Sequence, residues 1–464
     1  ELDPFDFVSG FEAIKAENDS EKKQKMLDDL NGLMRNFQEN YLMTARDFAQ
    51  WGAYEDAVLV LKQCTKKYPM LYYYAAYYEE KMGEDESAKK SLEKAESCAF
   101  DYCFPNKLDD IAVLTFAIEN GCKKKAPYYL GNLFYDKLQW KKSVELWEMS
   151  EKADDTFSIV HRNLALAYYN KMGDSKAAKY ELEKAFSLNR KDARIFLELD
   201  QLYKKLGYSF KERLAKYDED PSLAESRDDL YIEYITLMNM CGEYERAYRC
   251  IMGRRFHPWE GGEGKITTQY TISLLEMAKQ CLASEKYEQA EKLLKKALVY
   301  PENLGEGKLE GTKDNHLFYH LGLALEAQGK HDEAKTCFET ATIGTDEPAG
   351  AMYYNDQPAD MILYQGLAFE KLGKTREAKS RFYRLIDYGE QHLNDEGKIE
   401  YFAVSLPDFL IFDEDYTKKN RAHCCYLMAL GNIGLQNREK AAEFLNEALE
   451  IEPSHMMATL YQKQ

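Results

Sequence analysis

The chain has 464 residues, an apolar content of 45% and a formal net charge of −18. This negative charge argues against nucleic acid as a partner, because proteins bind the phosphate backbone through basic surfaces. No apolar run approaches the roughly 20 residues that cross a membrane, so no membrane partner is predicted.

A recurring spacing of small and apolar residues predicts helical hairpins along most of the chain. One copy of the pattern has intervals of 3, 4, 5, 4 and 3 residues and consists of Gly322, Leu325, Gly329, Ala334, Phe338 and Ala341. The first two residues would face a neighbouring helix, and the glycine in the middle would end their helix. The remaining residues recur on one face of a second helix. Other copies begin at Ala45, Ala76, Gly366 and Ala429.

In chain order, residues 1–37 are predicted to form an N-terminal arm and a lead-in helix. Residues 38–252 are predicted to form a first array, with hairpins at about 38–68, 70–97, 126–152, 158–188, 193–216 and 228–252 and an extra helix near 106–121. Residues 253–464 are predicted to form a second array, with hairpins at about 271–299, 315–342, 359–387 and 422–450. From Ser454 onward, a C-terminal helix is expected to cap the final hairpin.

This register resembles the tetratricopeptide repeat (TPR). The resemblance implies an all-α, right-handed superhelical solenoid of helical hairpins. It does not identify a ligand, because such a fold is a scaffold on which different binding sites are built.

The spacing between hairpins increases partway along the chain. Ala247, Ala290, Ala334 and Ala378 are 43, 44 and 44 residues apart, whereas the earlier hairpins repeat every 34 or 35 residues. The extra residues lie between hairpins, in connections that emerge at one edge of a hairpin solenoid. We call this the loop edge. It comprises connections 253–270, 300–314, 343–358 and 388–420, and we predict that it is the working surface.

The first two connections are rich in side chains that are suited to binding. The candidates are Arg254, Arg255, Phe256, His257, Trp259, Glu260, Glu263 and Lys265 in the first connection and Glu306 and Lys308 in the second. Three interpretations remain open. The connections could simply cover helix ends, or they could dock another domain or protein through aromatic and arginine anchors. Alternatively, Trp259 could stack on a sugar whose hydroxyls bind to the neighbouring histidine and carboxylates.

Cysteine and histidine usage indicates neither a disulfide framework nor a metal site. The ten cysteines have no framework spacing, which predicts free thiols in a reducing, cytoplasmic compartment. His316 and His320 share a helix face, but zinc would need a third ligand that the sequence does not offer nearby. Gly305 and Gly307 follow no predicted strand and precede no Lys-Ser/Thr pair, so no nucleotide cofactor is predicted.

Segments 254–265 and 300–305 resemble those of a bacterial family of unassigned function. Its members join an N-terminal β-sandwich region, similar to aldose mutarotases, to a C-terminal TPR array. The segment 2–7 resembles the junction between these halves, and the start at Glu1 without Met is typical of a piece of a longer protein. The resemblance implies a carbohydrate connection for such a protein but transfers no catalytic residue.

The sequence therefore predicts a non-catalytic TPR scaffold. Its partner would be another protein or an adjoining N-terminal domain. The alternative is a part of a carbohydrate-binding or carbohydrate-active enzyme, to which segment 254–265 would contribute site residues.

Overall fold

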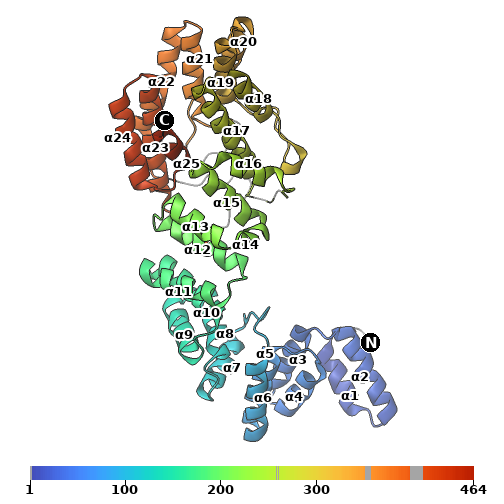
Figure 1. Cartoon of the computed structure of the whole chain (residues 1–464). Coiled ribbons are helices and arrows are strands. Elements are labelled where there is room, and N and C mark those ends of the chain that lie inside the picture. Colours follow the sequence, from blue (N-terminus) through green and yellow to red (C-terminus); the bar gives the residue numbers. More distant parts are fainter. Residues whose placement is uncertain (1–2, 258, 260, 351–356, 398–410, 464) are drawn as a thin grey trace. The chain divides into compact units, whose positions relative to one another are not determined.

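A computed structural model describes residues 3–257, 259, 261–350, 357–397 and 411–463, and every regular element in these ranges is a helix (Figure 1). The helices are arranged as successive hairpins, which confirms the predicted all-α TPR-like solenoid. They form two compact units, unit 1 (Glu1–Asn189) and unit 2 (Arg190–Gln464). The predicted division at 252–253 rested on connection length, whereas the units reflect which hairpins pack together.

Within the described residues, unit 1 begins with two helices, where an arm and one helix were predicted. These are α1 (Phe7–Ala16) and α2 (Ser20–Met34). Asp6 caps α1 by accepting the Ser9 N–H at 3.1 Å, and Asp19 caps α2 in the same way. Residues 7–16, which belong to the predicted arm, are helical because Asp6 caps α1 and Phe7, Phe11 and Ile14 form a buried face.

The other helices of unit 1 agree closely with the predicted hairpins. The pairs are α3 (Gln38–Gln50) with α4 (Tyr54–Gln63), α5 (Pro69–Lys81) with α6 (Asp85–Ser97), α8 (Lys125–Asp136) with α9 (Trp140–Ala153), and α10 (Ser158–Ala167) with α11 (Ser175–Leu188). The predicted extra helix is α7 (Leu108–Glu119). A π-helical turn, η1 (Tyr168–Met172), extends α10. A π-helical turn holds one more residue than the α-helical turn it replaces, and the sequence of this hairpin has one additional residue before Gly173.

The described residues of unit 2 form six hairpins. They are α12 (Ala193–Lys205) with α13 (Phe210–Glu219), α15 (Asp228–Met240) with α16 (Tyr244–Met252), α17 (Lys265–Ala283) with α18 (Tyr287–Ala297), α19 (Asn315–Ala327) with α20 (His331–Ala341), α21 (Met361–Lys371) with α22 (Thr375–His392), and α23 (Tyr416–Gly434) with α24 (Arg438–Ile451). The short elements are α14 (Pro221–Glu225), η2 (Glu302–Leu304) and α25 (Met456–Gln462).

The predicted connections of unit 2 are partly helical. Residues 265–270 belong to α17, residues 388–392 to α22 and residues 416–420 to α23. Helix α17 starts early because Gly264 adopts a φ of +77°, and Ile266 and Tyr270 then continue its buried face. Loop predictions based on repeat length alone therefore overestimated these connections.

Close packing at the small residues confirms the repeat register. A Cβ atom added at Gly322 would lie 2.5 Å from the Phe338 ring, and one added at Gly366 would lie 2.2 Å from the Phe382 ring. Each glycine thus lets the second helix of its hairpin approach the first. This is the role that the recurring small residue was predicted to have.

Helix α25 packs well beyond the final hairpin that it was expected to cap. Leu460 is buried in a cluster with Met240 of α15 and Ile272 of α17. The Tyr461 hydroxyl donates a hydrogen bond of 2.7 Å to the Tyr364 hydroxyl of α21. The C-terminal helix therefore binds to helices from several earlier hairpins, because its apolar side chains complete the interior of unit 2.

The first and last hairpins of unit 2 are also in contact. Lys205, the last residue of α12, forms an ion pair with Glu414, which precedes α23. Pro453 lies 3.8 Å from the position that a Cβ atom of Gly207 would take. The last hairpin of unit 2 therefore lies against the first hairpin of the same unit.

The cysteines are free thiols. Burial raises the pKa of Cys103 and of Cys122 to about 12. None of the helices described by the structure is long and apolar enough to cross a membrane.

Candidate functional site

The first connection of the loop edge is anchored by Phe256. This side chain is 2% exposed, and its ring stacks on that of Tyr231 in α15 at a centroid distance of 6.2 Å. Its backbone N–H donates to the Asn303 carbonyl at 2.8 Å. Phe256 therefore fixes the connection against α15 and against the next connection.

Arg254 lies beside this anchor and also has a structural role. Its guanidinium lies 4.8 Å from the Tyr231 ring centroid and 5.4 Å from that of Phe256. It forms an ion pair with Asp228 and donates to the Glu225 carbonyl at 2.9 Å. Through these contacts, Arg254 holds the connection to the start of α15.

Asn303 joins the first two connections, a role that was not predicted from the sequence. Its side-chain amide donates to the carbonyls of Ile251 at 2.9 Å and Arg254 at 3.0 Å. Its own carbonyl accepts from Phe256, so one residue satisfies two backbone groups of the preceding connection and one at the end of α16. The available signal was an asparagine next to the Pro301-Glu302 turn, since asparagine readily bonds to backbone groups.

Glu306 and Lys308 stabilise the second connection. A carboxylate oxygen of Glu306 accepts the Gly264 N–H at 2.8 Å, and burial raises the pKa of Glu306 above its usual value. The Lys308 ammonium lies 2.6 Å from Asp314 and 4.9 Å from the Tyr300 ring centroid. Both candidates thus bind within the loop edge itself.

Trp259 is half-buried and packs on its own turn. A Cβ atom added at Gly262 would lie 2.2 Å from the indole, so a glycine is required there. The Lys265 ammonium lies 5.7 Å from the indole ring. Pro258 and Glu260 lie outside the described residues.

The remaining candidates of the first connection are exposed. The His257 side chain is 78% exposed, with its Nδ1 atom 3.3 Å from Asp228. Glu263 is exposed and accepts the Gly261 N–H within its own turn at 2.8 Å. Arg255 is exposed as well. His257 and Glu263 have separate partners and do not form a common pair.

The third and fourth connections are described in part, because residues 351–356 and 398–410 lie outside the described residues. In the third connection, the Asn315 amide donates to the carbonyls of Ala341 at 2.7 Å and Ile343 at 2.8 Å. The Gln357 side chain accepts from the Thr345 N–H at 2.9 Å and donates to its carbonyl at 2.7 Å. As in the first two connections, amide side chains fix the backbone.

Exposed apolar side chains gather on the loop edge. Among the described residues of unit 2, the large hydrophobic side chains that are exposed are Met252 at 38%, Val299 at 66%, Leu309 at 58%, Ile343 at 59% and Tyr383 at 52%. Leu309 and Ile343 lie in the connections, and Met252 and Val299 directly precede a connection. The loop edge therefore combines a fixed backbone with exposed apolar groups.

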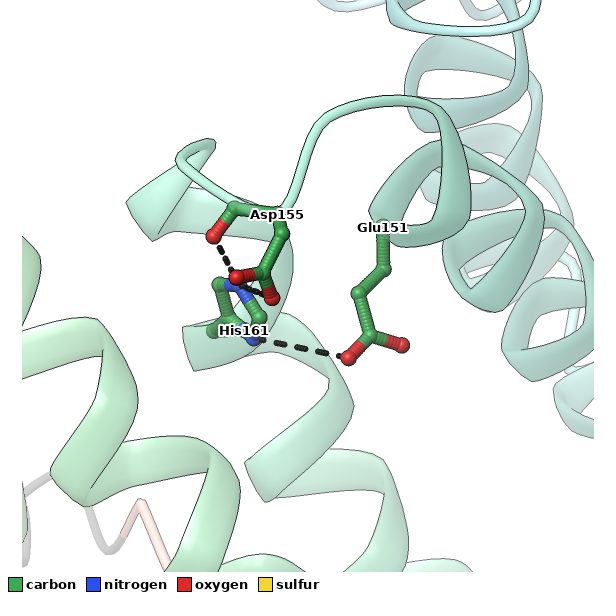
Figure 2. Close-up of side chains that lie close together, drawn as sticks. All are labelled: Glu151, Asp155 and His161. Atoms are coloured by element: carbon green, nitrogen blue, oxygen red, sulfur yellow. Dashed lines mark hydrogen bonds and ion pairs between the residues drawn. The ribbon is translucent and has the colours of Figure 1, made fainter.

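Unit 1 holds a cluster with metal-ligand side chains, Glu151, Asp155 and His161, whose ligand atoms lie within 4.8 Å of one another (Figure 2). The two ring nitrogens of His161 already have partners, Glu181 at 2.6 Å and the Asp155 carbonyl at 3.0 Å. Asp155 also pairs with Lys184 at 2.7 Å. This arrangement fits a buried ion pair better than a metal site.

The His161–Glu181 pair makes a testable contribution to stability. Burial alone would lower the pKa of His161, but the bond to Glu181 and nearby carboxylates raise it above the usual value. A raised folded-state pKa stabilises the protein below the unfolded value near 6.5, and this effect is lost as pH rises through the folded value. We expect His161→Phe to cost about 3 kcal/mol at pH 6, because it leaves Glu181 unpaired.

Denaturant unfolding of unit 1 at pH 6 and pH 9 measures this cost. The cost of His161→Phe should be smaller at pH 9, and the double variant His161→Phe with Glu181→Leu should recover much of the lost stability. An equal cost at both pH values would contradict the role of the charged imidazole.

His316 and His320, the pair considered for zinc, lie deep in unit 2. The Nδ1 atom of His320 is 2.7 Å from the His316 carbonyl. Burial lowers the pKa of each to about 3, so both are neutral near pH 7.

Comparison with known proteins identifies repeats in the C-terminal region. Family models of the tetratricopeptide repeat match residues 316–342, 360–388 and 422–455. These ranges correspond to the hairpins α19–α20, α21–α22 and α23–α24. Unit 2 therefore carries TPR repeats.

Three solved structures show weak similarity to the chain. The chain is 13% identical to one in the structure of Naa15/Naa10 bound to HypK-THB, with a TM-score of 0.33, covering 92% of this chain and 60% of that one. A tetratricopeptide repeat protein from Parabacteroides merdae is 18% identical, with a TM-score of 0.27, covering 62% and 98%. MamA is 15% identical, with a TM-score of 0.21, covering 37% and 89%.

Proposed function

Because unit 2 carries TPR repeats, we propose that the chain is a non-catalytic scaffold for protein or inter-domain binding and that its working surface is the loop edge. The exposed apolar side chains of Met252, Val299, Leu309 and Ile343 are the observation that carries this proposal. Exposed apolar side chains in successive connections are suited to protein binding, because a partner that covers them removes apolar area from water.

The division of roles within the first connection supports docking. Arg254 and Phe256 bind within the scaffold, so that the connection has a defined backbone before a partner arrives. Arg255, His257 and Glu263 are left exposed as a polar rim. A preorganised surface loses little conformational entropy on binding, which favours affinity.

The partner in this proposal is a separate protein or an adjoining domain. The carbohydrate alternative would need Trp259, His257 and nearby carboxylates to face one ligand. Among the described residues, His257 bonds to Asp228 and Glu263 to its own turn, which favours the docking function.

Site-specific photo-crosslinking in the native host tests the proposal. A photoreactive residue at position 299 or 343 should form covalent adducts with the same polypeptide, because both positions lie on the loop edge. Trp259→Ala, or Val299→Asp with Ile343→Asp, should then weaken binding of that purified polypeptide by about 2 kcal/mol or more, as expected for interface anchors.

Position 383 provides the matched control. Tyr383 is 52% exposed and lies on α22, away from these connections. If position 383 crosslinks as efficiently as positions 299 and 343, or if the latter two yield no protein adduct, the loop edge is not the docking surface.

A further inference from the structure

Unit 1 has its own edge of inter-hairpin connections, at 35–37, 64–68, 98–107 and 120–124. The Asn36 side chain bonds to the Thr65 hydroxyl and N–H, both at 2.9 Å, which joins the first two connections. The buried side chains of Tyr68 and Cys103 lie close together, which joins the second to the third. Lys125 directly follows the fourth connection, and its ammonium bonds to the Cys98 carbonyl of the third. These contacts make the four connections one continuous surface.

This surface presents apolar side chains to solvent. Tyr102 is 87% exposed, Phe104 is 66% exposed and Leu108 is 81% exposed. Phe37, at the start of α3, is 49% exposed. Burying three such side chains against a partner would release a substantial apolar area from water.

The segment that carries these residues is held in a fixed conformation. Cys103, between the two exposed aromatic residues, is 1% exposed and anchors the segment in the interior of unit 1. A carboxylate oxygen of Asp110 accepts the N–H groups of Asn106 and Lys107, both at 2.8 Å. The rings of Tyr102 and Phe104 therefore project from a supported backbone.

The same surface is basic, although the chain as a whole has 80 acidic and 62 basic residues. The four connections contain one carboxylate, Asp101, and six cations, which are Arg35, Lys66, Lys67, Lys107, Lys123 and Lys124. Lys124 pairs with Asp154. Within the part of the chain that the structure describes, the other five cations form no ion pair.

Folding does not account for all of these cations. Lys107 and Lys124 occupy the N-cap positions of α7 and α8. The N-terminal end of a helix carries partial positive charge, so a cation there is unfavourable. Lys124 has a carboxylate partner in Asp154. Among the described residues, the charge of Lys107 has no such partner in the fold, and it is better explained by a binding partner of opposite charge.

We propose that this surface, which we call the aromatic–basic edge, binds an acidic protein segment in which carboxylates alternate with apolar side chains. The carboxylates pair with Lys67, Lys107 and Lys123, while the apolar side chains cover Tyr102 and Phe104. The aromatic–basic edge lies wholly in unit 1 and is independent of the loop edge of unit 2.

Selection from a displayed pool of random peptides, each about a dozen residues long, tests this proposal with the full chain as bait. The enriched peptides should contain several carboxylates together with Leu, Phe or other apolar residues. Their affinity for the full chain should fall with added salt, because exposed charge pairs are screened. Tyr102→Ala with Phe104→Ala should weaken binding about tenfold or more, as expected when interface anchors are removed.

Charge reversal gives the second variant and its matched control. The triple variant Lys67→Glu, Lys107→Glu and Lys123→Glu should also weaken binding about tenfold or more. Glutamate at Lys89, Lys90 and Lys94 of α6, which are exposed and outside the four connections, changes the net charge equally and should leave binding unchanged. Thermal melts of all variants should match that of the parent, since the substituted side chains are exposed.

Three outcomes would overturn the proposal. One is that no peptide is enriched, or that the enriched peptides are neutral or basic. Another is that the α6 control weakens binding as much as the edge variants do. The third is that a single-stranded oligonucleotide binds more tightly than the selected peptides and is lost in the same variants, which would assign the surface to nucleic acid. Val299→Asp with Ile343→Asp should not affect peptide binding, so the two proposals fail separately.

Discussion

Replacing Phe382 with alanine is expected to destabilise unit 2 by about 3–5 kcal/mol. The ring is fully buried and fills the space between glycines of two other helices, Gly366 in α21 and Gly434 in α23. Because these glycines have no side chains that could move into the vacated volume, the cavity should persist. Phe338, which is 3% exposed against Gly322, should behave similarly.

Denaturant unfolding monitored by circular dichroism measures this loss. Tyr383→Ala provides the control, since this neighbouring aromatic residue is 52% exposed and its removal should cost less than about 1 kcal/mol. Equal costs for the two variants would show that the register of the repeats has been assigned incorrectly.

Unit 2 is expected to lose about 4 kcal/mol of stability when the pH falls from 7.5 to 5.5. Burial lowers the pKa of His316 and His320 to about 3 and that of His423 and His455 to about 4. The unfolded chain has histidine pKa values near 6.5, so it binds more protons than the folded unit in this pH range. Stability is therefore fully present above pH 6.5 and is lost as the pH falls.

Carboxyl groups whose pKa is raised by burial oppose this effect, among them Asp360, Asp314, Glu306 and Asp200. Burial raises the pKa of Asp360 to about 6, so the folded unit gains a proton there on acidification. This contributes about 1 kcal/mol in the opposite direction, against about 1.4 kcal/mol for each histidine at pH 5.5. The four histidines consequently decide the sign.

Native-state hydrogen exchange, resolved peptide by peptide, can follow unit 2 separately from unit 1. His455→Asn is the matched variant, because the His455 side chain accepts the Ala458 N–H at the start of α25 and asparagine is also a good N-cap. It removes one titrating group and should reduce the pH dependence by roughly a quarter. Opening free energies that do not change between pH 7.5 and 5.5 would contradict the prediction.

The hairpins could be predicted from the sequence because their packing is local. The small residue at Gly322 and the large one at Phe338 belong to the same hairpin, so a short window contains both contact partners. Contacts between distant segments leave no such signal. Asn303 bonds to Ile251 across 52 residues, and Leu460 packs against Met240 of an early hairpin.

The candidate site also depends on contacts between segments that are distant in the sequence. The sequence correctly singled out segment 254–265 as unusual, but Arg254 and Phe256 are types that could serve equally in packing or in docking. Their structural role depends on Tyr231 and Asp228, which the repeat pattern does not place beside them. Conversely, Val299 and Ile343 were not predicted as site residues, because the residue type of a single apolar side chain does not show whether it is exposed.

The contact between the first and last hairpins of unit 2 affects how this unit folds and unfolds. In an open solenoid each hairpin contacts only its neighbours, so terminal hairpins fray first and folding can spread from any point. In unit 2 the ion pair between Lys205 and Glu414 joins segments 209 residues apart. Detaching the first hairpin therefore also exposes the last, which makes opening more cooperative. Closing so long a segment costs chain entropy before these contacts form, so unit 2 should fold more slowly than an open array of equal length.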